Sequence, residues 1–407
     1  MLEKHYRWVI VAAGGLMGCV AIGAMFALPV FIVPMAEATG WSRTGISSAM
    51  TIAFLAMAFG SMFWGSLADR IGPRAVVLIG SILLAVSIAL VSQCRTLWEF
   101  QLVFGLLVGI AVAAIFAPMM AAVTGWFDTH RSLAVSLVSA GMGMAPLTMS
   151  PLAAWLVERM DWRASYLWIA LIVTVLMIPA AFLIRRPPAL EAGAPAAAQS
   201  ADAVPEMSVS QALWSPQFVI LALTNFFCCA THSGPIFHTV SYAIACGIPA
   251  ITAVTIYSLE GLAGMGGRIG FGLLGDRLGA KHVLVAGLLI QAVGALGYFF
   301  ASNLASFYAV AVIFGFTYAG IMPLYSVLAR ENFPLRMMGT IIGGTAMAGS
   351  LGMSTGPLLG GWIFDHTGNY GWLYISCFGM GIGAFLIAML FRPFRKRTEV
   401  LAPQTVP

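Results

Sequence analysis

Two charged side chains interrupt a long apolar stretch of the chain, at Glu260 and Arg268 within residues 249–273. A run of this length can cross a membrane, and an arginine at its centre costs at least about 2.5–3.5 kcal/mol on insertion scales. Such an arginine usually faces water or a partner, and its planar guanidinium matches a carboxylate with two hydrogen bonds. Arg268 is therefore the candidate binding group for an organic carboxylate. The alternatives are a permanent ion pair with Glu260 and a side chain that extends to the membrane interface.

Glu260 lies eight residues before Arg268. In a helix, eight residues span about 12 Å along the axis, and the two side chains face directions about 80° apart. A direct contact between them is therefore not expected. Glu260 is instead a candidate proton-coupling site, or a carboxylate near the outer interface.

Two histidines lie in another apolar stretch, at positions 232 and 238. Histidine titrates near physiological pH, so either side chain could carry a proton or hydrogen-bond a carboxylate. We interpret both His232 and His238 as proton-coupling candidates. A packed helix contact is the alternative for each.

A charged turn occurs twice in the chain. Residues Gly65–Arg74 return as Gly272–Lys281, each aligned position 207 residues later in a chain of 407. The chain is therefore close to two copies of one unit, a construction that many secondary transporters share. Each turn carries one acidic and two basic side chains, which are Asp69, Arg70 and Arg74 in the first copy and Asp276, Arg277 and Lys281 in the second.

The composition requires lipid as the main solvent. Hydrophobic residues make up 60% of the chain and charged residues 9%, whereas soluble proteins carry about 25% charged residues. The six cysteines show no metal-ligand spacing and are expected to be small buried hydrophobes. No nucleotide-binding turn and no set of nucleophile, base and acid can be assembled. We therefore expect no enzyme activity, no metal and no cofactor.

Twelve apolar stretches have a length that can cross a membrane, which takes about 20 residues in a helix. With the N-terminus in the cytoplasm, 15 basic residues fall inside and 4 outside, which is the bias that cytoplasmic loops show. This bias explains the net charge of +5 without nucleic acid. We predict a multi-pass protein of a bacterial inner membrane with both termini cytoplasmic. The predicted spans are 8–36, 45–68, 75–93, 97–122, 132–156, 164–184, 213–238, 249–273, 281–301, 304–328, 337–362 and 370–391.

Residues 187–210 break the apolar pattern midway between the two copies. This segment is rich in proline and alanine and has no packing face, which is typical of a linker. We therefore predict an N-terminal six-helix bundle at 1–186, a cytoplasmic linker at 187–210 and a C-terminal six-helix bundle at 211–407.

Two six-helix halves with this charged turn after the second helix of each resemble the major facilitator superfamily. The resemblance covers the whole chain and implies an all-α membrane fold of twelve helices in two pseudo-twofold bundles. It also implies that the two turns form a cytoplasmic gate, which latches neighbouring helices when that face is closed. A plain solvated turn at the membrane edge is the alternative.

Finer motifs are similar to the monocarboxylate-porter branch of this family and its bacterial members. They are the Gly-Trp-Ser-Arg run at 40–43, the stretch at 126–143 and the run at 238–248. In this resemblance Arg268 occupies the place of the branch's substrate-binding arginine. The positions of His238, Tyr318 and Phe116 resemble those that line its pocket, so these residues are further substrate-binding candidates.

Two departures concern residues that this branch associates with proton coupling. Val30 stands where many animal members have a lysine, and Gly264 stands where they have an aspartate. The resemblance therefore implies a secondary transporter for a small organic monocarboxylate, similar to lactate or pyruvate carriers, with protons as one coupling option. We expect a small organic anion as substrate, a lipid bilayer as surroundings and a functional monomer. The alternatives are an exporter of amphiphilic drugs or larger organic anions, and a membrane ligand sensor.

Overall fold

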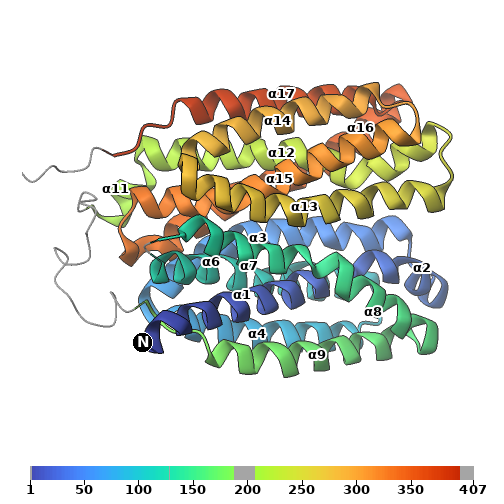
Figure 1. The fold of residues 1–407 in the computed structure, drawn as a ribbon. Helices are drawn as coiled ribbons and strands as arrows, with labels where there is room; N and C mark the ends of the chain where they lie inside the picture. The colour runs from blue at the N-terminus through green and yellow to red at the C-terminus, as the bar shows by residue number, and fades with distance from the viewer. Residues whose placement is uncertain (1, 128, 188–206, 395–407) are drawn as a thin grey trace, which may run out of the picture.

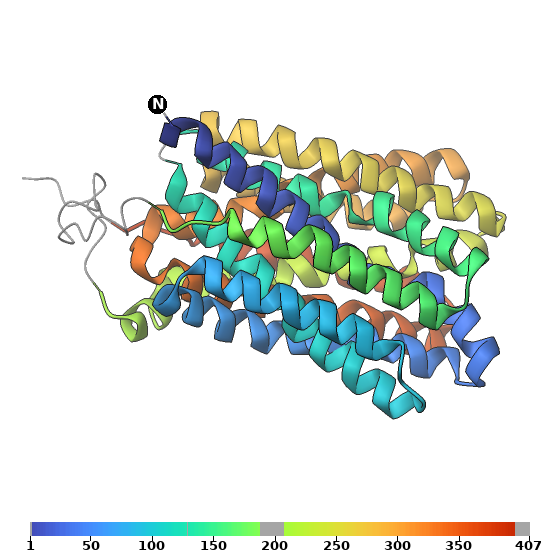
Figure 2. The same cartoon turned by 90° about the horizontal axis from the view of Figure 1, so that it is seen from below.

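The computed structural model describes residues 2–127, 129–187 and 207–394, and its regular elements in these ranges are helices. The helices share one long axis and form two bundles, one from α1 to α9 and one from α12 to α17 (Figure 1). In the view from below, the helices of the N-terminal bundle also run along that axis (Figure 2). The predicted all-α fold in two bundles is confirmed.

The N-terminal bundle contains six units of membrane length, of which three are interrupted. Proline accounts for two of the interruptions, because Pro29 and Pro146 lie in the first turns of α2 and α8 and lack the N–H that would continue the preceding helix. The elements are α1 (Leu2–Phe26), α2 (Leu28–Thr39), α3 (Arg43–Ile71), α4 (Pro73–Val91), α5 (Leu97–Phe100), a π-helical segment (Gln101–Val108), α6 (Gly109–Trp126), α7 (Arg131–Gly143), α8 (Ala145–Arg159) and α9 (Trp162–Phe182).

The C-terminal bundle has longer continuous helices. It begins after a short helix, α11 (Val209–Leu213), and one 3-10 turn (Leu335–Met337) precedes α16. Its helices are α12 (Pro216–Ala245), α13 (Ala250–Leu278), α14 (Ala280–Phe300), α15 (Leu304–Asn332), α16 (Met338–Thr367) and α17 (Gly371–Met389).

The two charged turns share one backbone conformation. Gly72 between α3 and α4 has φ +95°, and Gly279 between α13 and α14 has φ +87°. Glycine adopts these angles without the strain that a side chain would add. The repeated sequence therefore reverses the chain in the same way in both bundles. We call the end of the molecule that holds these turns the turn end, and the opposite end the far end.

Both described ends of the chain also lie at the turn end. The Tyr6 hydroxyl donates to the Leu183 carbonyl at 2.8 Å, and Arg186 Nη2 donates to the Arg70 carbonyl at 3.2 Å. In the other bundle, the Phe394 N–H donates to Asn332 Oδ1 at 3.1 Å. The predicted linker at 187–210 falls mostly outside the described residues, so the proposed domain boundaries stay a prediction.

Ten helical segments in the described ranges are long and apolar enough to cross a membrane. The helices α13 and α16, of 29 and 30 residues, have the length but fall outside that set. They carry polar and glycine positions because they face the other bundle, where α13 meets α7 and α16 meets α3. Together with the ten segments they correspond to the twelve predicted spans.

Candidate functional site

A cavity of about 270 Å³ lies between the two bundles. Its wall comes from α1, α3, α6 and α7 on one side and from α12, α13, α15 and α16 on the other. Three of the predicted substrate-binding residues line it, namely Arg268, Tyr318 and Phe116. His232, which was predicted only as a proton-coupling candidate, lines it as well.

Arg268 contacts the opposite bundle from its place on α13. Its Nε donates to the Ser139 Oγ on α7 at 3.0 Å. Its guanidinium passes so close to Gly143 that a β-carbon there would collide with Nη1. Among the described residues, no carboxylate forms an ion pair with Arg268, and its two Nη groups make no hydrogen bond. These donors are therefore available on the cavity side.

Glu260 does not line this cavity. It lies on α13, eight residues before Arg268. Its side chain is fully buried, and Oε2 accepts a hydrogen bond of 2.8 Å from the Tyr298 hydroxyl on α14. Oε1 has no hydrogen-bond partner among the described residues. A buried polar atom without a partner is costly, so this oxygen is a place where a proton would be held.

His232 is oriented by a network on its side away from the cavity. The Cys228 carbonyl can only accept, so the Gln291 atom 3.0 Å from it is the amide nitrogen. The Cys228 thiol donates to Gln291 Oε1 at 3.3 Å, which agrees with this orientation. The same amide nitrogen lies 3.2 Å from Nδ1 of His232.

This network selects one tautomer of the His232 ring. Because the Gln291 nitrogen donates, Nδ1 accepts, and the neutral ring then carries its proton on Nε2. A proton on Nδ1 would compete with Gln291 for the Cys228 carbonyl and would face another donor. The Tyr318 ring stacks on one face of the imidazole, with centroids 5.0 Å apart. His232 therefore offers the cavity an N–H donor near Arg268.

His238 is the one predicted substrate-binding residue outside the cavity wall. Its ring lies against Gly360 of α16 and 5.3 Å from the Tyr370 ring. His232 and His238 share α12, but six residues in a helix turn the second side chain about 120° from the first. The helix therefore presents one histidine to the cavity and the other to its own bundle.

The two acidic residues of the charged turns each cap a helix of the opposite bundle. Asp69 accepts from the backbone N–H groups of Gly339 and Thr340 at 2.7 Å each, and from the Thr340 hydroxyl at 2.6 Å. Asp276 accepts from the N–H groups of Ser132 and Leu133 at 2.9 and 3.1 Å. A carboxylate at a helix N-terminus satisfies free N–H groups and the helix dipole. The first turn therefore holds α16, and the second holds α7.

The basic residues of the turns lie beside these contacts. The Arg74 guanidinium lies 5.3 Å from the centre of the Phe182 ring, while Arg70 and Arg277 are exposed. Lys281 is half-buried at the start of α14. The carboxylates thus bind helix ends, and most of the basic side chains are exposed at the turn end.

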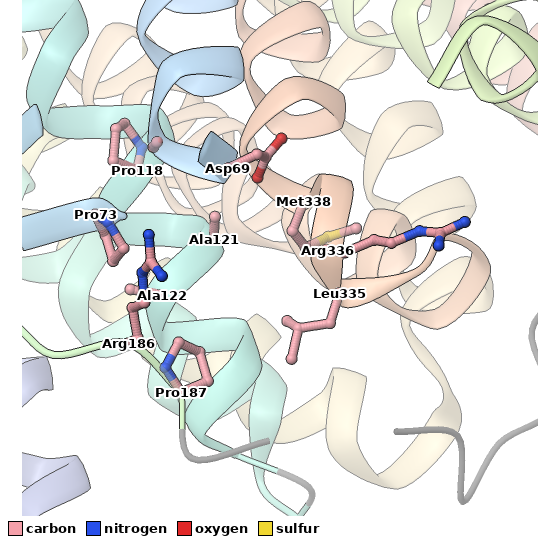
Figure 3. A pocket seen from close by; sticks show the side chains of 11 residues that line it. Asp69, Pro73, Pro118, Ala121, Ala122, Arg186, Pro187, Leu335, Arg336 and Met338 are labelled. Carbon is pink, nitrogen blue, oxygen red and sulfur yellow. The ribbon is translucent and has the colours of Figure 1, made fainter. Parts of the chain in front are cut away.

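Close packing between the bundles accompanies the two caps. A β-carbon at Gly65 would collide with the Gly339 carbonyl, and one at Gly343 would collide with the Ser61 carbonyl. A small pocket of about 140 Å³ remains beside Asp69. Figure 3 shows the Asp69 side chain close to the start of α16, with Arg186 projecting from the N-terminal bundle and the Arg336 guanidinium pointing away. The bundles are therefore in contact at the turn end.

Sequence reasoning missed Ser139, Gly143 and Gln291. Ser139 and Gly143 lie in the stretch that carries the family resemblance, but their spacing alone does not indicate which helix faces them. Gln291 is a polar residue in an apolar span, 1% exposed. A buried amide inside a membrane helix is a signal that could have identified it.

Comparison with known proteins gives consistent similarities. A profile described as Major Facilitator Superfamily matches residues 14–354 and 271–406. Monocarboxylate transporter 13 of Rattus norvegicus is 26% identical over 388 residues, which cover 95% of this chain and 88% of that protein. The uncharacterized MFS-type transporter YcxA of Bacillus subtilis (strain 168) is 23% identical, with 91% of each covered. FucP, a major facilitator transporter solved in the outward conformation, is 13% identical with a TM-score of 0.74, over 95% of this chain and 99% of that one.

Proposed function

This chain belongs to the major facilitator superfamily, and we propose that this multi-pass membrane transporter carries a small organic monocarboxylate by alternating access. One observation carries the proposal. Arg268 lines the central cavity with its Nη donors free of hydrogen bonds to described residues and with no carboxylate paired to it. A charge in such a site is costly unless a ligand supplies the counter-charge. The carboxylate of the substrate would do so through the guanidinium fork.

His232 is the second proposed hydrogen-bond donor to the carboxylate of the substrate. Its Nε2–H tautomer follows from the Gln291 contact, and the ring lines the same cavity as Arg268. One carboxylate can accept several hydrogen bonds, so both donors can serve it. Tyr318 supports the His232 ring by stacking.

We propose that the turn end faces the cytoplasm of a bacterial cell, as the excess of basic residues in its loops favours. The Asp69 and Asp276 caps then close the cytoplasmic face, and the substrate reaches Arg268 from the far end. Release inward requires both carboxylates to leave the helix ends of α16 and α7. Since one chain supplies the whole cavity wall, we propose a functional monomer.

Glu260 is the proposed proton site. It is fully buried, one of its oxygens lacks a partner among the described residues, and it lies on the same helix as Arg268. A proton on Glu260 would satisfy the free oxygen, and its exchange could be linked to movement of α13. Glu260 would then take the role of the aspartate that animal members of the monocarboxylate-porter branch carry at the position of Gly264.

Transport into proteoliposomes tests the proposed function. Uptake of labelled monocarboxylates is measured with and without an inward proton gradient, for the natural chain and for Arg268→Lys. We expect saturable uptake of a monocarboxylic acid, and no competition by the corresponding amide. Arg268→Lys should lose this uptake. Equal competition by acids and their amides would contradict a carboxylate substrate. An exporter of larger organic anions remains the second candidate, because the cavity also has an extensive apolar wall.

A further inference from the structure

The two bundles contribute different chemistry to the central cavity. The N-terminal bundle provides an aromatic and thioether surface, which we call the Phe–Met wall; it consists of Phe26, Phe54, Phe116, Met57, Met120 and Met142. Its two hydroxyl residues at the cavity each already take part in one hydrogen bond. Ser61 donates to the Met57 carbonyl at 2.7 Å, and Ser139 accepts from Arg268. The Phe–Met wall therefore offers a ligand contact surface but little hydrogen bonding.

The polar groups of the cavity come mainly from the C-terminal bundle. Arg268 is its cationic side chain and His232 its imidazole, and further polar atoms come from residues that include Asn225, Thr345, Tyr318 and Tyr325. Asn225 Nδ2 is engaged with the Thr345 carbonyl at 2.9 Å. A molecule that bridges the cavity thus meets hydrogen-bond donors on one side and an apolar surface on the other.

The Phe–Met wall is suited to an aromatic or branched apolar group. The Phe26 and Phe54 rings meet edge to face with centroids 6.0 Å apart, and Phe54 meets Phe237 of the other bundle at 6.3 Å. Aromatic rings prefer such edge contacts, and thioether side chains adapt their shape to an apolar neighbour. The wall can therefore accept one more ring without a polar partner.

Resting on the proposed monocarboxylate function, we infer that the substrate is a monocarboxylate with an apolar tail, a ring or a branched chain. The carboxylate binds Arg268, and the tail lies on the Phe–Met wall. The hydroxyl or keto group of an acid of the lactate or pyruvate kind is on the carbon next to the carboxylate, so it would stay beside Arg268 and leave the Phe–Met wall uncovered. An apolar tail instead gains by leaving water. The cavity of about 270 Å³ also exceeds what a three-carbon acid fills, and approaches the roughly 300 Å³ of small ligand pockets.

Binding of three probes to the full chain in nanodiscs tests this inference. The probes are 3-phenylpropionate, pyruvate, and 3-phenylpropan-1-ol, which has the ring without the carboxylate. We expect 3-phenylpropionate to bind at least about tenfold more tightly than pyruvate, since each apolar group accommodated by a pocket contributes about that factor. The alcohol should bind far more weakly than the acid.

Two matched variants separate the tail from the carboxylate. Phe116→Leu removes a ring from the Phe–Met wall, whereas Phe59→Leu removes a ring that is 67% exposed on α3 outside the cavity. Phe116→Leu should weaken 3-phenylpropionate severalfold and leave pyruvate within twofold, and Phe59→Leu should change neither. Pyruvate binding as tight as 3-phenylpropionate, or an equal loss of both acids in Phe116→Leu, would overturn the apolar tail. If the alcohol bound as tightly as the acid, or if neither acid bound, the proposed monocarboxylate function itself would be contradicted.

Discussion

Arg268 Nε on α13 donates a 3.0 Å hydrogen bond to Ser139 Oγ on α7, across the boundary between the two bundles. The contact lies in the wall of the central cavity, while the Asp69 and Asp276 caps lie at the turn end. A ligand that binds the free side of the guanidinium therefore acts on a residue that already joins the bundles. The proposed binding of substrate at Arg268 would therefore have a direct physical connection to movement of the bundles.

Arg268→Lys and Arg268→Ala should both lose carboxylate binding while the protein still folds. Lysine keeps the charge but lacks the two-bond fork. Removing one partner of a desolvated charge pair costs about 2–5 kcal/mol, which is a loss of affinity of about thirtyfold or more. Binding is measured by calorimetry, and folding by melting in detergent. If Arg268 served only to pair with Glu260, Arg268→Ala would impair folding and the added Glu260→Gln change would restore transport.

Gly143→Ala should weaken binding although it replaces no charged residue. The added methyl group would collide with Arg268 Nη1 and displace the guanidinium from its place over α7. Gly261→Ala on α13 is the matched control, because open space surrounds that position. The dissociation constant for the acid should rise several-fold in the first variant only. Unchanged affinity in Gly143→Ala would show that the guanidinium does not need this position.

Gln291→Met should change the tautomer of His232. Without the amide donor, Nδ1 is free to carry the proton, and the fixed Nε2–H donor is lost. Nitrogen-15 spectra of histidine-labelled protein report the tautomer directly, and the chain has six histidines to assign. We expect mixed tautomers and severalfold weaker acid binding. Gln217→Met is the control, since Gln217 bonds the Arg392 carbonyl at the turn end. A His232 signal that stays unchanged would refute the orienting role of Gln291.

Asp69→Asn should open the turn end more than Asp276→Asn. Asp69 accepts three hydrogen bonds at 2.6–2.7 Å, and Asp276 accepts two at 2.9–3.1 Å. Hydrogen bonds to a charged group contribute about 1.5–3 kcal/mol each in such comparisons, and a neutral amide loses part of that. Distances between spin labels at the two bundles measure the opening. Equal effects of the two variants would mean that the number and length of the bonds do not set the strength of the gate.

Glu260→Gln should separate proton coupling from binding. The amide keeps a partner for Tyr298 but cannot exchange a proton. Uptake should then no longer respond to an inward proton gradient, while acid binding at Arg268 stays within a few-fold of the natural chain. Gradient-driven uptake by Glu260→Gln at the natural rate would exclude Glu260 as the proton site.

Much of the fold and part of the site could be predicted from local features of the chain. The apolar stretches, the repeat of 207 positions and the single intramembrane arginine depend on composition and spacing alone. They predicted the membrane class, the two bundles, the duplicated turn and Arg268 as the central polar residue. Glycine at positions 72 and 279 likewise follows from the backbone angles that the turns require.

The tertiary structure decided which groups meet across the two bundles. The sequence analysis treated His232 and His238 alike as candidates in one apolar stretch, and the rotation of α12 in its bundle determined that His232 lines the cavity. The same holds for Asp69 and Asp276, whose partners are backbone N–H groups of helices far along the chain. Helix packing fixes these contacts through the shapes of many side chains at once, and no short stretch of sequence contains that information.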